Sequence, residues 1–102
     1  MPTRQQILNL LELEPDDPFM LYALASDYAK EGEHESAIEY FEKTIEVDPD
    51  YCYAYYHQAR SFEALDRIPE AVATLDRGLV ASKRVGDAKA INETSQYRTM
   101  LA

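Results

Sequence analysis

The side chains that most often do chemistry in enzymes and metal sites are scarce in this sequence. It contains two histidines, His34 and His57, and one cysteine, Cys52, in 102 residues. Cys52 and His57 are five residues apart in one predicted helix, a rotation of about 140° around the helix axis, so a nucleophile and its base would not share a face. His34 stands between two glutamates in a predicted turn, where we expect a solvated loop histidine. The sequence therefore predicts no catalytic residue and no metal site.

The motifs that bind phosphates, hold metals or activate a serine are also missing from the sequence. It contains no glycine-rich phosphate loop, no paired-cysteine motif and no nucleophile elbow. Carboxylates are numerous, but Glu35, Glu39, Glu42 and Glu46 follow at helical spacing and indicate a solvated helix face. We therefore expect a protein that is not an enzyme and needs no cofactor.

The charge of the chain is strongly negative and unevenly placed. The net charge is -9; residues 1–51 hold 13 acids and 3 bases, whereas residues 52–102 hold 6 acids and 7 bases. The first half would repel a phosphate backbone, and the second half has no concentrated basic stripe, so we expect no nucleic-acid partner. The acidity favours solubility, and an acidic face could also attract a basic partner.

The sequence gives no sign of export or of membrane insertion. Residues 1–10 mix Arg4 and glutamines with apolar residues, which is unlike a secretory signal. Charged residues interrupt every apolar segment before it approaches the ~20 residues that span a bilayer. A single cysteine cannot form an internal disulfide, which is compatible with a reducing compartment. We expect a cytoplasmic protein with no membrane partner.

A repeat of 34 residues organises the central part of the chain. Pro15 and Pro49 lie 34 residues apart in similar contexts, at residues 13–17 and 47–51. The same shift superposes Ala25 on Ala59, Tyr28 on Phe62, Ala37 on Ala71, Phe41 on Leu75 and Ile45 on Leu79. Small residues fall on small ones and large apolar residues on large ones, which indicates a repeated supersecondary unit.

Start and stop signals predict two helices in the first repeat. An N-cap carboxylate, Asp17, precedes Pro18 and predicts a helix over residues 18–30 with one apolar face, in which Leu24 is buried. Gly32 ends this helix, and Pro49 ends a second one over residues 34–47. Alanines, Ala25 and Ala37, stand where the two helices must approach closely.

Similar signals predict the remaining helices. Asp50 would cap a helix over residues 51–65, and Pro69 would open another that continues to about residue 85. Gly86 and Asp87 indicate a stop and a restart before a last helix over residues 87–101, with a stripe of Ala90, Ile91, Thr94, Tyr97 and Leu101. Apolar residues ahead of Pro15 predict one more helix at the start: Ile7, Leu8, Leu10 and Leu11.

The pattern resembles the tetratricopeptide repeat, a helix-turn-helix unit of 34 residues with fixed large and small positions. In residues 18–51 the matching positions are Leu21, Leu24, Ala25, Tyr28, Gly32, Ala37, Phe41 and Pro49. In residues 52–85 they are Tyr55, Ala59, Phe62, Ala71 and Leu75. Gln58, Asp66 and Lys83 depart from the leucine, glycine and proline of the pattern, so we expect the second helix of that repeat to overrun.

The resemblance implies an all-α fold, a right-handed α-solenoid in a single domain. Two full repeats, residues 18–51 and 52–85, would be flanked by an N-terminal capping helix in residues 1–17 and a C-terminal one in residues 86–102. Because a helical hairpin cannot bury its own apolar face, neighbouring hairpins must stack and the ends need caps.

The resemblance also implies a binding groove. In the family, four positions of the first helix of each repeat face the concave side. Carried over to this sequence they are Phe19, Tyr22, Ser26 and Ala29 in the first repeat, and Tyr53, Tyr56, Arg60 and Glu63 in the second. Aromatic rings and arginine suit a binding patch. In the alternative interpretation, Tyr53 and Tyr56 pack on the C-terminal helix and the groove is covered.

The function that follows is a non-catalytic module that binds a peptide or protein segment in this groove. Some family members grip a partner's terminal carboxylate with lysine, asparagine and arginine on the inward face; here only Arg60 fits that pattern, so we do not expect such a clamp. The alternative function is structural, with the chain self-associating as a homodimer or larger homo-oligomer.

Overall fold

Helices account for nearly all of the chain in the computed structural model, which describes residues 2–101. They are α1 (Arg4–Leu13), α2 (Pro18–Lys30), α3 (His34–Val47), α4 (Cys52–Ala64), α5 (Ile68–Val85) and α6 (Ala88–Leu101). No strand occurs between residues 2 and 101. The all-α class is confirmed. None of the helices in this range is both long enough and apolar enough to cross a membrane.

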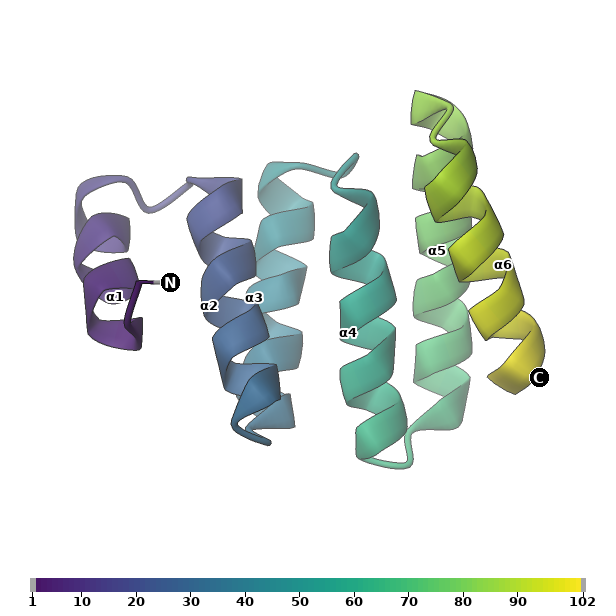
Figure 1. Ribbon diagram of the computed structural model, residues 1–102, viewed down its shortest axis with the longest axis horizontal. Coiled ribbons are helices and arrows are strands. Elements are labelled where there is room, and N and C mark those ends of the chain that lie inside the picture. Colours follow the sequence, from purple (N-terminus) through teal and green to yellow (C-terminus); the bar gives the residue numbers. More distant parts are fainter. Residues whose placement is uncertain (1, 102) are drawn as a thin grey trace.

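The helices form two antiparallel hairpins with a single helix at each end. Helices α2 and α3 make one hairpin and α4 and α5 the other, while α1 packs on α2 and α6 packs on α5. Figure 1 shows α2, α4 and α6 on the near side and α3 and α5 behind them. This arrangement is the stacked helical array expected of repeat proteins.

The array curves toward the row made by α2, α4 and α6, which we call the inner row. Helix α2 contacts α4 and α4 contacts α6, whereas α3 and α5, within the described part of the chain, do not approach each other. Since the helices of the inner row lie closer together than those behind them, the inner row occupies the concave side.

Local signals set most helix ends where the sequence predicts them. The Asp17 carboxylate accepts hydrogen bonds from the backbone N–H groups of Phe19 and Met20, at 3.0 and 3.3 Å, and Pro18 begins the helix. Gly32 and Gly86 have φ of 79° and 75°, a left-handed conformation that glycine adopts without steric cost. Helix α5 overruns to Val85, as the replacement of the repeat's terminal proline predicts.

Two predictions about local structure are wrong. Asp50 does not cap α4: Tyr51 occupies the N-cap position without a side-chain hydrogen bond, and the Asp50 carboxylate instead accepts a 2.6 Å hydrogen bond from Arg84 of α5. His34 is not a solvated loop residue. It is the first residue of α3, it is half-buried, and its ring shares a 3.2 Å hydrogen bond with Ser61 of α4.

The core consists of small residues at helix crossings and large residues between the hairpins. Leu24, Ala25, Ala37 and Phe41 have no exposed surface, as predicted for the first hairpin. In the second hairpin Ala59, Phe62, Ala71 and Leu75 form a buried cluster with Tyr97 of α6. The small residues let the helix backbones approach, and the large ones fill the space that remains.

Gly78 marks a close approach between α4 and α5. A Cβ atom added at this residue would lie 2.8 Å from the Cβ and 3.3 Å from the Cγ of Tyr55. Tyr55 is buried, and its hydroxyl donates a 2.6 Å hydrogen bond to the backbone carbonyl of Pro49. The ring is therefore held at both ends, and its Cβ cannot yield without a shift of the backbone.

We predict that Gly78→Ala destabilises the protein. Helix propensity alone would favour alanine by about 1 kcal/mol, but overpacking against a fixed side chain costs about 1–3 kcal/mol. The expected net result is a lower free energy of unfolding in a urea titration. Gly32→Ala is a useful comparison, because its Cβ would meet no neighbouring atom and only its positive φ is penalised. A Gly78→Ala variant more stable than the parent would contradict the close approach.

Candidate functional site

The inward face of α4 holds the centre of the candidate site. Tyr53, Tyr56, His57 and Arg60 are spaced three and four residues apart and therefore lie on one side of the helix. Three of these residues are predicted groove residues. His57 was missed, although its spacing from Tyr53 and Arg60 would have placed it on this face.

The His57 ring lies among aromatic side chains from three helices. Its centroid is 5.3 Å from that of Tyr56, 6.0 Å from Tyr22 of α2 and 6.3 Å from Phe41 of α3. This burial, followed by the positive charge of Arg60, lowers the pKa of His57 below its ordinary value of 6.5, and Glu93 of α6 acts in the opposite direction. His57 is therefore mainly a neutral ring at neutral pH.

On α2, the two predicted aromatic residues have different surroundings. Tyr22 is half-buried; it stacks on Tyr51 with ring centroids 4.7 Å apart and meets the edge of Phe41 at 5.7 Å. Phe19, one turn earlier, is 63% exposed. Tyr22 thus packs on Tyr51, which lies in the segment between the two hairpins, whereas Phe19 presents its ring to solvent.

A hollow of about 380 Å³ lies between α2 and α4. Three predicted groove residues line it: Ser26, Ala29 and Arg60. The sequence did not assign to the groove its other polar residues, which are Lys30, His34, His57 and Ser61. The hollow is large enough to receive a side chain of a bound segment.

A second hollow, of about 260 Å³, lies between α4 and α6. Its α4 wall contains three predicted residues, Tyr56, Arg60 and Glu63. From α6, Tyr97 packs its ring 5.2 Å from that of Tyr56, and its hydroxyl donates a hydrogen bond to the Glu63 carboxylate. Burial and this carboxylate together raise the pKa of Tyr97.

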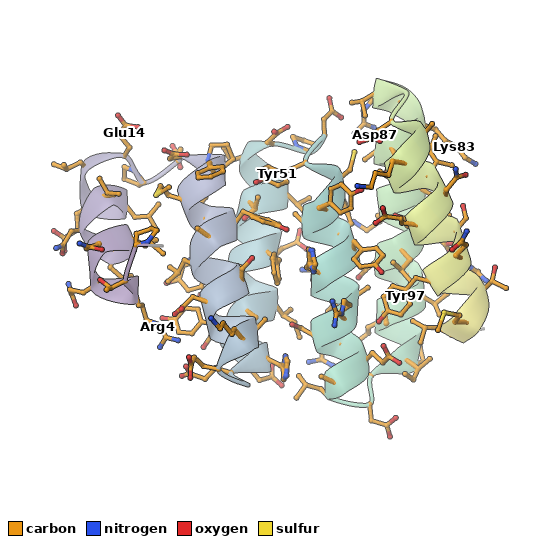
Figure 2. All side chains as sticks on the ribbon, in the orientation of Figure 1. Arg4, Glu14, Tyr51, Lys83, Asp87 and Tyr97 are labelled. Atoms are coloured by element: carbon orange, nitrogen blue, oxygen red, sulfur yellow. The ribbon has the colours of Figure 1, made fainter. Side chains whose placement is uncertain are left out.

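Helix α6 therefore contacts the inward face without filling it. The packing of Tyr56 on Tyr97 agrees with the alternative that α6 covers part of the groove, and Figure 2 shows Tyr97 lying between α6 and α4. Hollows nevertheless remain on both sides of Arg60, which lines each of them and is exposed. Tyr53 lines neither hollow; its ring lies 6.2 Å from that of Tyr56.

Comparisons with known proteins agree with this arrangement. Two family profiles, both described as tetratricopeptide repeat, match residues 18–51 and 53–77. An uncharacterized protein of Methanocaldococcus jannaschii is 34% identical over 68 residues, which make up 67% of this chain and 79% of the relative.

Solved structures are similar over most of the chain. The crystal structure of a tetratricopeptide repeat domain protein from Salinibacter ruber is 34% identical, with a TM-score of 0.76, and the match covers 83% of this chain and 96% of that one. The TPR2B domain of yeast Sti1, in a complex with pHsp70, has a TM-score of 0.89 at 23% identity. That match covers 96% of this chain and 78% of that one, and it concerns the fold alone.

The lowered pKa of His57 predicts a pH dependence of stability. As the pH falls below about 6.5, the unfolded chain binds a proton at this histidine more readily than the folded chain does. The contribution of His57 to the free energy of unfolding is therefore complete above that pH and is lost below it. We expect the free energy of unfolding to fall less between about pH 7.5 and about pH 5.5 in His57→Gln than in the parent. An equal fall in both proteins, measured by urea titration, would contradict the assignment.

Proposed function

Because the chain belongs to the tetratricopeptide repeat family, we propose that it is a non-catalytic interaction module that holds a peptide or protein segment of a partner along the inner row. The observation that carries this proposal is the inward face of α4, where Tyr56 and Arg60 stand between two hollows. The Sti1 domain, a fold neighbour in a complex with pHsp70, supports the same use of the fold.

The residue types on this face suit protein binding. Tyrosine buries a large rigid area at a low entropic cost, and arginine offers a planar set of donors. Truncation of such residues at the centre of an interface commonly costs ~2 kcal/mol or more. In this proposal Arg60 and Tyr56 are the central contacts. The surrounding contacts come from three residues of α2 and from one residue near each end of α4: Phe19, Tyr22 and Ser26, and Tyr53 and Glu63.

The aromatic side chains of this surface are already held in place in the absence of a partner. Tyr22 is stacked on Tyr51, and Tyr56 is in contact with both Tyr97 and His57. Side chains that are already fixed lose little further entropy on binding, so more of the contact energy appears as affinity. Arg60 is the exception, because it is exposed and free to adjust to the partner.

The test is a binding measurement on surface variants. A partner isolated from the source cell is titrated against the parent and against Arg60→Ala, for which we expect a loss of affinity of about thirtyfold. Glu46→Ala is the matched control, since Glu46 is an exposed residue of α3, away from the inner row. Circular dichroism checks that both variants remain folded. If Glu46→Ala weakens binding of the partner and Arg60→Ala does not, the site lies on the acidic outer surface.

A second candidate function, self-association, is favoured by the free face of α1. Among the described helices α1 contacts only α2. Its outward side holds Leu10 and Leu13, which are 47% and 81% exposed, beside an open hollow of about 450 Å³ that includes Gln6 and Asn9. A second copy of the chain would remove this apolar surface from water.

Self-association predicts a mass that rises with concentration. Light scattering over a dilution series of the parent would show this rise, and Leu13→Glu would abolish it, because a charge would be buried in the contact. Val80→Glu, at an apolar residue of α5 that is also exposed, is the control. A constant monomer mass across the series rules out this function and leaves α1 as a cap.

A further inference from the structure

Most of the basic side chains of this protein are neutralised by its own carboxylates. Seven of the ten lysines and arginines lie within 4.0 Å of an aspartate or glutamate: Arg4, Lys43, Arg67, Arg77, Arg84, Lys89 and Arg98. Within residues 2–101, the three bases without such a partner are Lys30, Arg60 and Lys83.

Two of these three bases line the same hollow, the one between α2 and α4. Lys30 is the last residue of α2 and Arg60 lies on the inward face of α4. Both histidines of the chain, His34 and His57, line it as well, and none of the described residues around it is acidic. Chance does not favour this composition in a chain with 19 acids and 10 bases.

The polar groups around the hollow are those that bind an oxyanion. Lysine and arginine provide charged N–H donors, and the hydroxyls of Ser26 and Ser61 provide neutral ones. The ring of His34 is held in position by its hydrogen bond with Ser61. Phe41 of the hydrophobic core forms an apolar wall, which lowers the local dielectric and strengthens the attraction between opposite charges.

We propose that the hollow formed by Lys30, His34, His57 and Arg60 binds a carboxylate or phosphate group carried by the partner segment. The inference rests on the proposed function, and it narrows the partner to a segment with an acidic or phosphorylated residue. It differs from the terminal-carboxylate clamp of the family, because only Arg60 belongs to the inward positions of that pattern. Lys30 and His34 come from the end of α2 and the start of α3.

The net charge of the protein does not oppose this site at physiological ionic strength. Exposed charges are largely screened beyond a Debye length of about 8 Å at 0.15 M salt. The charges that line the hollow, together with Glu93 of α6, which acts on His57, therefore determine its potential, and the acids on the outer surface contribute little. A segment that is acidic along its whole length would also bring negative charges beside Glu63 and Glu93 in the neighbouring hollow, so the expected ligand is an isolated anionic residue.

The first experiment uses sodium sulfate as the probe, at constant ionic strength set by sodium chloride. We expect saturable shifts of the amide resonances of Lys30, His34, His57 and Arg60 in NMR spectra of the full chain. Lys30→Gln and Arg60→Gln should each weaken sulfate binding by about tenfold, because each removes one charged donor. Lys83→Gln makes the same change in net charge on α5, where Figure 2 shows Lys83 pointing away from the array, and should have no effect.

The pH supplies an independent readout, since sulfate keeps its charge across the range in which histidine titrates. A bound anion favours the imidazolium, so affinity should rise as the pH falls from about 7.5 to about 5.5, and His57→Gln should reduce this rise. The groups that face His57 are Tyr22 from α2, Glu93 from α6 and Tyr53, Tyr56 and Arg60 from α4, while α3 contributes the apolar Phe41.

Two blocked pentapeptides separate the sources of the anion. One carries a central glutamate and the other a central phosphoserine, both with neutral ends, and a glutamine peptide is the control. Tighter binding of the glutamate peptide identifies an acidic residue as the ligand, and tighter binding of the phosphoserine peptide identifies a phosphorylated one. The proposal is overturned if neither binds better than the glutamine peptide, or if Lys83→Gln weakens sulfate binding as much as Lys30→Gln.

The outcome is distinguishable from a failure of the proposed function. If Arg60→Ala weakens the natural partner but sulfate does not bind, the inner row is the binding surface and the anion site is wrong. If sulfate binds in the hollow but Arg60→Ala and Lys30→Gln leave the affinity for the partner unchanged, the hollow is an anion site and the partner binds elsewhere.

Discussion

The close approach of helices at small residues is the constraint on which the structure depends. Ala25 and Ala37 in the first hairpin, and Ala59 and Ala71 in the second, have no exposed surface. Larger residues there would separate the helices and open voids that the interior does not tolerate. At Gly78 there is not even space for a methyl group, since the Cβ of an alanine would collide with Tyr55. Because the hairpins are narrow, each leaves an apolar face that only a neighbour can cover.

The need for neighbours explains why the candidate site is made of aromatic residues. The rings that join the hairpins, Phe41 and Tyr51, contact Tyr22, which also lies 6.0 Å from His57 on the inward face. Phe41 therefore belongs to the core and also lines the hollow between α2 and α4, next to His57. The aromatic part of the site is therefore rigid, because its rings are held by core packing and not by loops, whereas Arg60 and Lys30 are exposed.

Ion pairs between the two halves of the chain are a second set of contacts in this structure. Acids of the first half pair with bases of the second, as in Arg77 with Glu42 at 3.1 Å and Arg84 with Asp50 at 2.6 Å. Each exposed pair contributes little stability, with a usual value of about 0–1 kcal/mol. Together, however, the pairs neutralise most of the basic residues on the outer surface. Among the side chains of residues 2–101, the positive charge that remains on the concave side is that of Arg60 and Lys30.

The sequence by itself determined the period of 34, the helical class and nearly every helix boundary, because propensity, capping and apolar spacing act between residues a few positions apart. It also placed Arg60 on the inward face, through the resemblance to the family. Only the tertiary structure decided that His34 joins His57 beside that arginine, and that Asp50 pairs with Arg84 instead of capping a helix. The residues of these two pairs are 23 and 34 positions apart in the sequence, and their juxtaposition follows from how closely the hairpins stack, which no local pattern encodes.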